Sequence, residues 1–113
     1  MIGNHFILDI YDCQEEQISH VENVRPLLHN IIEILNLSKV NESYKQFDPV
    51  GVTGVILLEE SHLSIHTWPE KQFAAMDIFS CKPFNSEEII TIVAEHLGTQ
   101  KIKTKNIVRG GEE

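Results

Sequence analysis

Glu59-Glu60-Ser61-His62-Leu63-Ser64-Ile65-His66-Thr67-Trp68-Pro69-Glu70 stands at the centre of the sequence, both in position and in chemistry. Apolar runs flank this stretch at residues 51–58 and 73–81, and each has the length and the β-branched or aromatic content of a buried strand. The reactive side chains between them are therefore expected to be held by the strands of one sheet.

The stretch itself alternates polar and apolar residues, which predicts that it is also a strand. A five-residue loop, residues 68–72, would join it to the following run as a hairpin and would place Ser61 opposite Phe79. Cys81 would then lie two residues beyond the partner of Ser61. A separate hairpin is required before Ser61, and it is expected to turn near Glu59-Glu60.

The other segments predict the remaining elements of a single small domain. Asn23 is the expected N-cap of a helix, because that start leaves Pro26 in the tolerant first turn. A second helix is expected to begin at Asn85 or Ser86 and to end at Gly98 in a left-handed cap. The remaining elements predicted are a strand at 5–11, a helix at 23–37, a partly exposed strand at 39–47, a helix ending at 97 and an edge strand at 100–108.

This order predicts an α+β fold, namely a two-layer α/β sandwich in which two helices cover one face of a mainly antiparallel sheet.

The 113 residues are enough for one domain with a core, spanning residues 1–113. A net charge of −8, with no basic stripe, argues against nucleic-acid binding and suits a cationic ligand. No apolar run reaches the length of a membrane span, and two cysteines without a signal-peptide pattern predict a cytoplasmic protein.

Two conventional chemistries could use the central histidines and Cys81. A metal site formed by His62 and His66 is disfavoured, because on a strand the two residues share a face but stand roughly 13 Å apart. A Cys-His hydrolase with Cys81 as nucleophile and His66 as base remains open on spacing alone. No metal ligand set is therefore predicted, and His62 is expected to be a structural histidine, while the role of Asp77 stays open.

A third chemistry uses Ser61 as a nucleophile against its own backbone. A hydroxyl held in a strained turn can attack the preceding carbonyl, that of Glu60, and convert the amide into an ester. Elimination and hydrolysis would then leave a pyruvoyl group at a new N-terminus. These steps require a base for the Cα proton of Ser61 and a donor for the transient oxyanion.

The residues that carry this chemistry also carry a family resemblance. Residues 51–55, 60–70 and 74–81, together with Gly3-Asn4-His5, resemble the short prokaryotic S-adenosylmethionine decarboxylases over most of the chain. The resemblance implies self-cleavage between Glu60 and Ser61 into a β chain, residues 1–60, and an α chain, residues 61–113. It also implies that Ser61 becomes a covalent pyruvoyl cofactor.

The same resemblance implies a role for each residue that matches the family's pattern. His66 would be the processing base, and Cys81 the acid that protonates the substrate carbon after carbon dioxide leaves. Thr53 stands where the family usually has serine and keeps the hydroxyl. Phe47 and Trp68 would contact adenine or the sulfonium charge, unless they are ordinary core or interface aromatics, and Glu70 would accept from ribose hydroxyls.

The predicted activity is the pyruvoyl-dependent decarboxylation of S-adenosylmethionine, which supplies the aminopropyl donor for spermidine and other polyamines. An alternative on the same scaffold is the decarboxylation of ornithine or arginine, which Asp48 and the net acidity would suit. A further alternative is a regulatory homologue that no longer cleaves. The resemblance also implies a homodimer of cleaved protomers.

Overall fold

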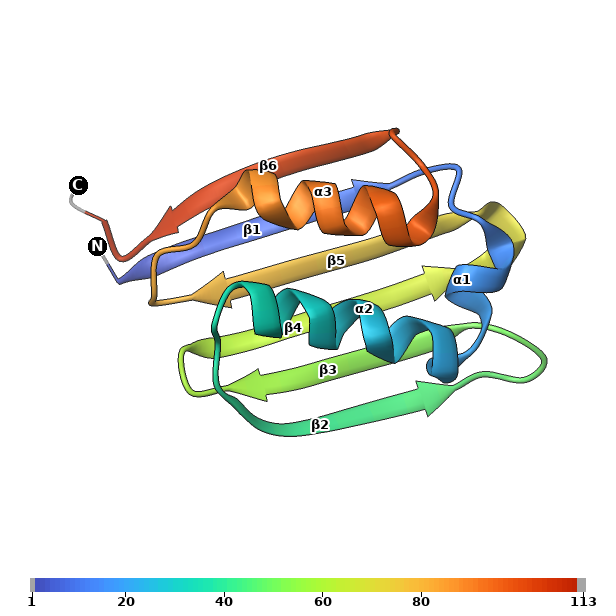
Figure 1. Ribbon diagram of the computed structural model, residues 1–113, viewed down its shortest axis with the longest axis horizontal. Helices are drawn as coiled ribbons and strands as arrows, with labels where there is room; N and C mark the ends of the chain where they lie inside the picture. Colours follow the sequence, from blue (N-terminus) through green and yellow to red (C-terminus); the bar gives the residue numbers. More distant parts are fainter. Residues whose placement is uncertain (1, 112–113) are drawn as a thin grey trace.

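The computed structural model describes residues 2–111, and a six-stranded antiparallel sheet runs through them in the order β2-β3-β4-β5-β1-β6 (Figure 1). Every neighbouring pair of strands is antiparallel. The reactive stretch forms β4, which lies near the middle of the sheet between β3 and β5. The strands are β1 (Gly3–Ile10), β2 (Lys39–Gln46), β3 (Val52–Leu58), β4 (Ser61–Trp68), β5 (Phe73–Ser80) and β6 (Ile102–Arg109).

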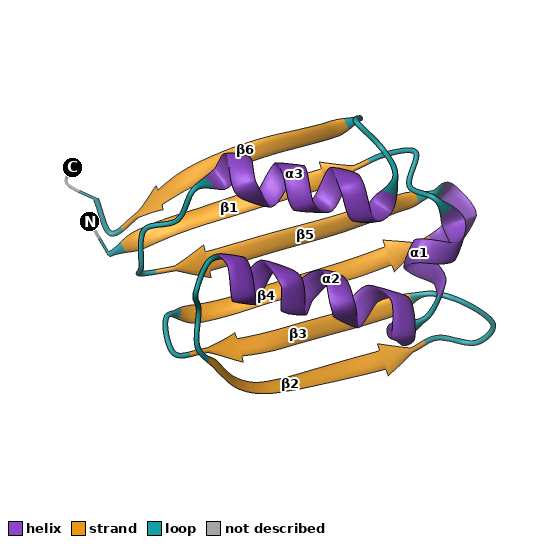
Figure 2. Ribbon diagram, viewed as in Figure 1, coloured by secondary structure: helices purple, strands orange, loops and turns teal. Residues whose placement is uncertain are grey.

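Two long helices, α2 (Val21–Ile34) and α3 (Ser86–Leu97), pack side by side on the same face of this sheet (Figure 2). A shorter helix, α1 (Glu15–Ser19), precedes α2, and a single 3₁₀ turn (Pro69–Lys71) joins β4 to β5. The predicted two-layer α+β sandwich is therefore confirmed, with one more short helix than expected. None of the helices within the described residues has the length and apolarity needed to cross a membrane.

Alternation along the central strands separates the core from the uncovered face of the sheet, which we call the open face. On β4, Leu63 and Ile65 are almost completely buried beneath the helices, whereas His66 and Trp68 are exposed on the open face. Each fully buried Leu or Ile contributes roughly 1.5–3 kcal/mol of hydrophobic free energy. This energy strongly favours the strand orientation in which Leu63 and Ile65 face the helices. The reactive polar side chains of β4 consequently point away from the helices.

The predicted ends of α3 are confirmed. The side chain of Asn85 accepts a hydrogen bond from the backbone N–H of Glu87, and Gly98 closes the helix in a left-handed conformation with φ of 68°. A capping oxygen at the first turn and a glycine after the last turn are the usual solutions for unpaired backbone groups at helix ends. The edge position predicted for the last strand is also confirmed, because β6 pairs only with β1.

The predicted start of the first helix is wrong. Helix α2 begins at Val21, after His20, so that Pro26 lies inside it, and Asn23 is not its cap. The side-chain amide of Asn23 instead donates to the carbonyl of Glu16, which ties α2 to the unpredicted helix α1. Helix α1 has only five residues and buries Ile18, too short a segment to show a helical period in the sequence.

The predicted register of the β4–β5 hairpin is wrong by one residue. Trp68 pairs with Phe73, so Ser61 lies opposite Ser80 rather than opposite Phe79. The loop is shorter than predicted because Trp68 joins the ladder, and Gln72 adopts a left-handed φ of 51° to close the connection. The other predicted hairpin does turn at Glu59-Glu60, with Leu58 opposite Ser61.

Candidate active site

The Glu60–Ser61 bond lies in the tight turn between β3 and β4, where it is held from two sides. The carboxylate of Glu60 accepts a hydrogen bond from the backbone N–H of Ser38 at 3.0 Å, and this contact lowers the pKa of Glu60. The carbonyl oxygen of Glu60 accepts a second hydrogen bond, at 2.8 Å, from the backbone N–H of Cys81. The turn is thus anchored both to the loop after α2 and to the end of β5.

Ser61 itself has a φ of 144°, a region that residues other than glycine rarely occupy. A residue held in such a conformation costs of order 1–3 kcal/mol, and it persists only where the surrounding structure imposes it. The hydrogen bonds on both sides of the turn supply that constraint. The nucleophile expected from the sequence is therefore found in a strained backbone conformation, directly beside a polarised carbonyl.

Cys81 is exposed immediately after β5. Its backbone is placed there by a close approach of Gly3 on β1, since a Cβ at Gly3 would lie 2.5 Å from the carbonyl oxygen of Ser80 and 3.1 Å from the Cα of Cys81. The register puts Cys81 one residue beyond the partner of Ser61. The structure therefore brings together three of the residues expected from the sequence at this end of the sheet: Glu60, Ser61 and Cys81.

The other predicted site residues gather around a cavity of about 240 Å³ at the opposite end of β3 and β4. Thr53 pairs with His66 across the two strands, and the hydroxyl of Thr53 lies 3.3 Å from Nδ1 of His66. The rings of His66 and Trp68 are stacked at a tilt, with centroids 6.4 Å apart. The predicted residues that line this cavity are Phe47, Thr53, His66, Trp68 and Glu70.

These two groups are not in contact within one chain. Ser61 and His66 lie five residues apart on the same strand, which corresponds to roughly 16 Å along β4. An imidazole and a serine side chain together cannot span that distance. The predicted site residues therefore form two separate groups. We call them the cleavage end (Glu60, Ser61 and Cys81), after the cut predicted there, and the cavity end (the five residues that line the cavity).

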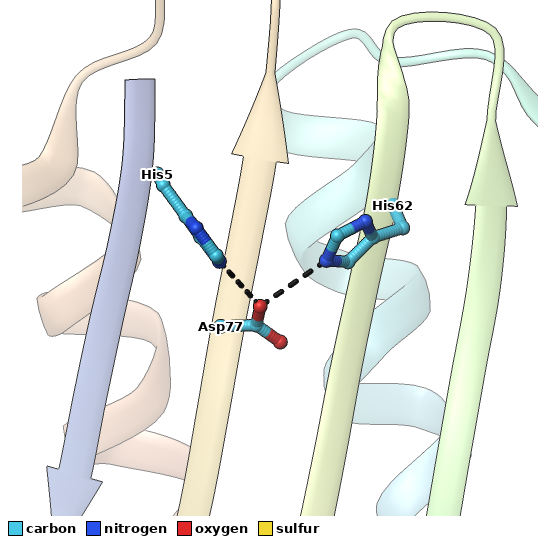
Figure 3. Close-up of side chains that lie close together, drawn as sticks. All are labelled: His5, His62 and Asp77. Atoms are coloured by element: carbon cyan, nitrogen blue, oxygen red, sulfur yellow. Dashed lines mark hydrogen bonds and ion pairs between the residues drawn. The ribbon is translucent and has the colours of Figure 1, made fainter. Parts of the chain in front are cut away.

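A third cluster, not predicted from the sequence, lies on the open face near the cleavage end (Figure 3). The carboxylate of Asp77 on β5 lies 2.6 Å from Nε2 of His5 on β1 and 3.1 Å from Nε2 of His62 on β4. Its second oxygen accepts a hydrogen bond from the hydroxyl of Ser64. Three adjacent strands thus converge on one carboxylate. Burial raises the pKa of Asp77, but the hydrogen bonds from Ser64, His5 and His62 outweigh it and hold the pKa below its usual value.

Two imidazoles and a carboxylate in this arrangement also have the composition of a metal-binding triad. The guanidinium of Arg109 argues against that use, because its Nη1 lies 3.2 Å from Nδ1 of His5 and can only donate. Nδ1 of His5 is therefore the acceptor, and Nε2 carries the hydrogen that points at Asp77. A cation would have to displace this hydrogen beside a positive charge, so the cluster is better described as a hydrogen-bond network.

The sequence held only a partial signal for this network. Alternation along each strand places His5, His62 and Asp77 on polar faces, but it does not reveal which strands are neighbours. Strand β1 comes between β5 and β6 in the sheet, although it is first in the chain. That long-range pairing, which brings residue 5 next to residue 77, is a property of the tertiary structure.

Comparison with known proteins bears directly on this geometry. Residues 4–110 match a sequence family described as S-adenosylmethionine decarboxylase. The chain is 44% identical to the S-adenosylmethionine decarboxylase proenzyme of Persephonella marina, with 96% of this chain and 83% of that one aligned. It is 48% identical to the corresponding proenzyme of a Sulfurihydrogenibium species, over 79% of this chain and 70% of that one. The crystal structure of the adenosylmethionine decarboxylase from Aquifex aeolicus superposes with a TM-score of 0.85 and 34% identity, covering 99% of this chain and 97% of that one.

Proposed function

Since this chain belongs to the S-adenosylmethionine decarboxylase family, we propose that it is the proenzyme of a pyruvoyl-dependent S-adenosylmethionine decarboxylase that cuts itself between Glu60 and Ser61. The observation that carries the proposal is the conformation and hydrogen bonding of the Glu60–Ser61 peptide. Its carbonyl is polarised by the N–H of Cys81, and the residue that follows it is held at a φ of 144°. Cleavage would give chains of residues 1–60 and 61–113.

The residues at the cleavage end fit a pyruvoyl group derived from Ser61. The hydroxyl of Ser61 is the nucleophile, and the N–H of Cys81 is aimed at the oxygen on which negative charge would develop. A pyruvoyl group supplies an electron sink for a bound amino acid that loses carbon dioxide. The thiol of Cys81 is proposed to return a proton to the substrate carbon, and its exposure supports this role.

His66 is proposed to act in processing, by removing the Cα proton of Ser61, with the hydroxyl of Thr53 supporting it. Support for this pairing is the 3.3 Å contact between Thr53 and His66. Because both lie at the cavity end, they cannot reach Ser61 of their own chain, and a second copy has to supply them. This requirement is the reason to propose a homodimer as the functional unit.

The open face of the sheet is proposed as the dimer interface. Val55 and Leu57 on β3 expose 42% and 53% of their surface there, and Trp68 at the far end of β4 exposes 40%. A two-fold axis through this face would place the cleavage end of each protomer against the cavity end of its partner, which gives two equivalent sites per dimer. Burying these side chains between two sheets would also remove an apolar surface from water.

The cavity end is proposed to bind the substrate. At about 240 Å³ its cavity is below the 300–1,000 Å³ usual for ligand sites, as expected of half a pocket that a partner completes. The rings of Phe47 and Trp68 offer stacking surfaces for adenine and for the sulfonium charge, a contact worth about 0.5–2 kcal/mol. The carboxylate of Glu70 is available to accept from ribose hydroxyls.

The product is proposed to serve as the aminopropyl donor for spermidine and other polyamines. We place the reaction in the cytoplasm, as the sequence predicts. Support comes from the two cysteines, which are both free in the structure, with Cys81 exposed. A reactive exposed thiol is best preserved in a reducing compartment.

The test is a decarboxylation assay that offers S-adenosylmethionine, ornithine and arginine side by side, together with the intact mass of the purified protein. We expect two chains that meet at Glu60 and Ser61, and release of carbon dioxide from S-adenosylmethionine. Release from ornithine or arginine alone would favour the basic amino acids as substrates. A single uncut chain that releases none would favour the regulatory homologue.

A further inference from the structure

Phe47 is proposed to stack on the substrate, although packing does little to hold its ring. The residue exposes 45% of its surface, and the ammonium of Lys45 lies 5.8 Å from the centroid of the ring. Phe47 begins the loop of residues 47–51, which joins β2 to β3 beside the start of α2 (Figure 1). Because an exposed ring gains little from the burial of apolar surface, its place at the cavity depends on how the loop backbone is held.

This loop is closed on itself and attached to the junction between α1 and α2, residues 18–21. The N–H of Phe47 donates to the carbonyl oxygen of Gly51 at 2.8 Å, which closes the loop. The N–H of Gly51 donates to the carbonyl oxygen of Ser19 at 2.9 Å. Ser19 is the last residue of α1, and the last carbonyl groups of a helix have no partner within it. The helix junction therefore offers acceptors to the loop.

The side chain of Gln46, the last residue of β2, joins the same groups together. Its Nε2 lies within hydrogen-bond distance of three carbonyl oxygens, those of Ser19 at 2.9 Å, Phe47 at 3.1 Å and Gly51 at 3.1 Å. Its Oε1 accepts a hydrogen bond at 2.8 Å from the N–H of Val21, the first residue of α2. A primary amide has the donors and the acceptor that these partners require. One side chain thus binds both ends of the loop and both helices.

We propose that Gln46 is a positioning residue for substrate binding, because it fixes the loop that presents Phe47 to the cavity. The inference rests on the proposed function, in which Phe47 contacts the substrate. Alternation along β2 puts Gln46 on the same face as Tyr44, which packs against the core, so Gln46 acts from the helix side of the sheet. A loop that is ordered before the substrate arrives loses less conformational entropy on binding, which raises the affinity.

A second side chain attaches the strands to the same junction. The hydroxyl of Thr67 on β4 donates to the carbonyl oxygen of Ile18 at 2.7 Å and accepts from the N–H of Val52 at 2.9 Å. Thr67 is buried and also lines the cavity. Because Thr67 holds β3 and β4 independently of Gln46, the loss of Gln46 should release the loop and leave the two strands in place.

This division of labour predicts which kinetic constant changes. Phe47 is proposed to contact the adenine or the sulfonium group and not the carbon that reacts, so its contact is made equally in the ground state and in the transition state. Loss of such a contact raises KM and leaves kcat nearly unchanged. The contact of Thr53 with His66 joins β3 to β4, so self-cleavage should continue without Gln46.

The experiment measures KM and kcat for S-adenosylmethionine on fully cleaved protein. Gln46→Met keeps the length of the side chain and removes its hydrogen bonds, so KM should rise by about 10-fold while kcat stays within about threefold. Gln46→Asn is the milder variant, since its amide is one methylene too short to span the junction and the loop, and KM should rise by about threefold. Either variant carries the test if the other does not fold.

Two control variants separate positioning from general damage to the fold. Gln100→Met makes the same substitution in the connection before β6, at the opposite edge of the sheet from β2. Ile89→Val, on a buried residue of α3, should lower the thermal midpoint without touching the loop. Both controls should keep the wild-type KM.

A double-mutant cycle tests whether Gln46 acts through Phe47. Phe47→Ala should itself raise KM, and Gln46→Met/Phe47→Ala should raise it no further, because the ring that Gln46 positions is already gone. A wild-type KM in both Gln46 variants, or two effects on KM that simply multiply in the double variant, would overturn the inference. A wild-type chain that releases no carbon dioxide from S-adenosylmethionine would instead refute the proposed function, so the two failures are distinguishable.

Discussion

The backbone N–H of Cys81 donates to the carbonyl oxygen of Glu60 over 2.8 Å, so the end of β5 touches the bond that is proposed to break. This contact uses the main chain and leaves the thiol of Cys81 free. In the proposed function one residue thus supports two steps: its N–H polarises the Glu60 carbonyl before the proposed cleavage, and its thiol is available for the proposed turnover afterwards. The two functions can be separated by substitution, because changing the side chain preserves the N–H.

Cys81→Ala should therefore still cleave, within a few-fold of the wild-type rate, yet lose most of its decarboxylation, by about 100-fold. His66→Ala should show the opposite pattern and stall before the pyruvoyl group forms. Intact mass measures the cleavage, and released carbon dioxide per cleaved chain measures the turnover. If Cys81→Ala processes and decarboxylates like the wild type, the proton donor lies elsewhere.

Ser61→Ala should give a folded, uncut and inactive chain, because the hydroxyl is the only group removed. Alanine is strained at a φ of 144° to the same extent as serine. The thermal midpoint should therefore stay close to that of an uncut wild-type chain. Ser61→Gly should be uncut as well but more stable, by about 1–3 kcal/mol, because glycine tolerates this φ. Thermal unfolding and intact mass test both variants, and cleavage of either one would refute the role of Ser61.

Two inactive variants should complement each other if the cleavage end and the cavity end meet across a dimer. In a mixed dimer of Ser61→Ala and His66→Ala chains, one site combines an intact Ser61 with the partner's intact His66. Random pairing would let about half of the His66→Ala chains be cut. The control pairs His66→Ala with a chain that carries both substitutions, where no site is complete. Absence of cleavage in a mixture shown to contain mixed dimers would contradict the shared site.

Gly3→Ala should weaken both the fold and the processing. A methyl group at Gly3 would lie 2.5 Å from the carbonyl oxygen of Ser80, a backbone atom that cannot give way without moving the end of β5. Overpacking of this kind costs typically about 1–3 kcal/mol. Because Cys81 follows directly, we expect slower cleavage together with the lower thermal midpoint. Unchanged values of both would show that β1 does not position Cys81.

The uncut Ser61→Ala chain should lose stability in acid through Glu42. The guanidinium of Arg25, with His29, Lys39 and Tyr44, holds the pKa of Glu42 far below its usual range. A carboxyl group whose pKa is lowered on folding contributes stability above its unfolded pKa, about 4.3, and loses it as the pH falls toward the folded value. The thermal midpoint should therefore decline steadily below about pH 4.5. Glu42→Gln should flatten that decline, whereas Glu87→Gln, at an exposed position of α3, should not.

Much of this protein could be predicted from local patterns. The alternation in residues 61–67 and the apolar runs on either side depend only on neighbours in the chain, and they predict β3, β4 and β5 correctly. Asn85 and Gly98 define α3 because caps satisfy backbone groups within one turn. Local chemistry also singled out Ser61 and Cys81, which the structure places on either side of the Glu60 carbonyl.

Properties that depend on distant residues could not be predicted in this way. The hairpin register differed by one residue because Trp68 joins the ladder, which is decided by packing and by the left-handed turn at Gln72. Helix α2 begins before Asn23, and the side chain of Asn23 bonds instead to Glu16 of another helix. The joining of His5, His62 and Asp77 requires β1 to insert beside β5, far from it in sequence.

The sequence by itself therefore determined the fold class and most of the elements, and it singled out the residues proposed to react, since these predictions follow from residue type, spacing and the family resemblance. Only the tertiary structure decided how those residues are grouped. A strand is straight and rises about 3.3 Å per residue, so residues 61 and 66 of one β4 are held apart however reactive they are. That rigidity divides the predicted site into two ends of one sheet, and it is the physical reason for proposing that a second chain completes it.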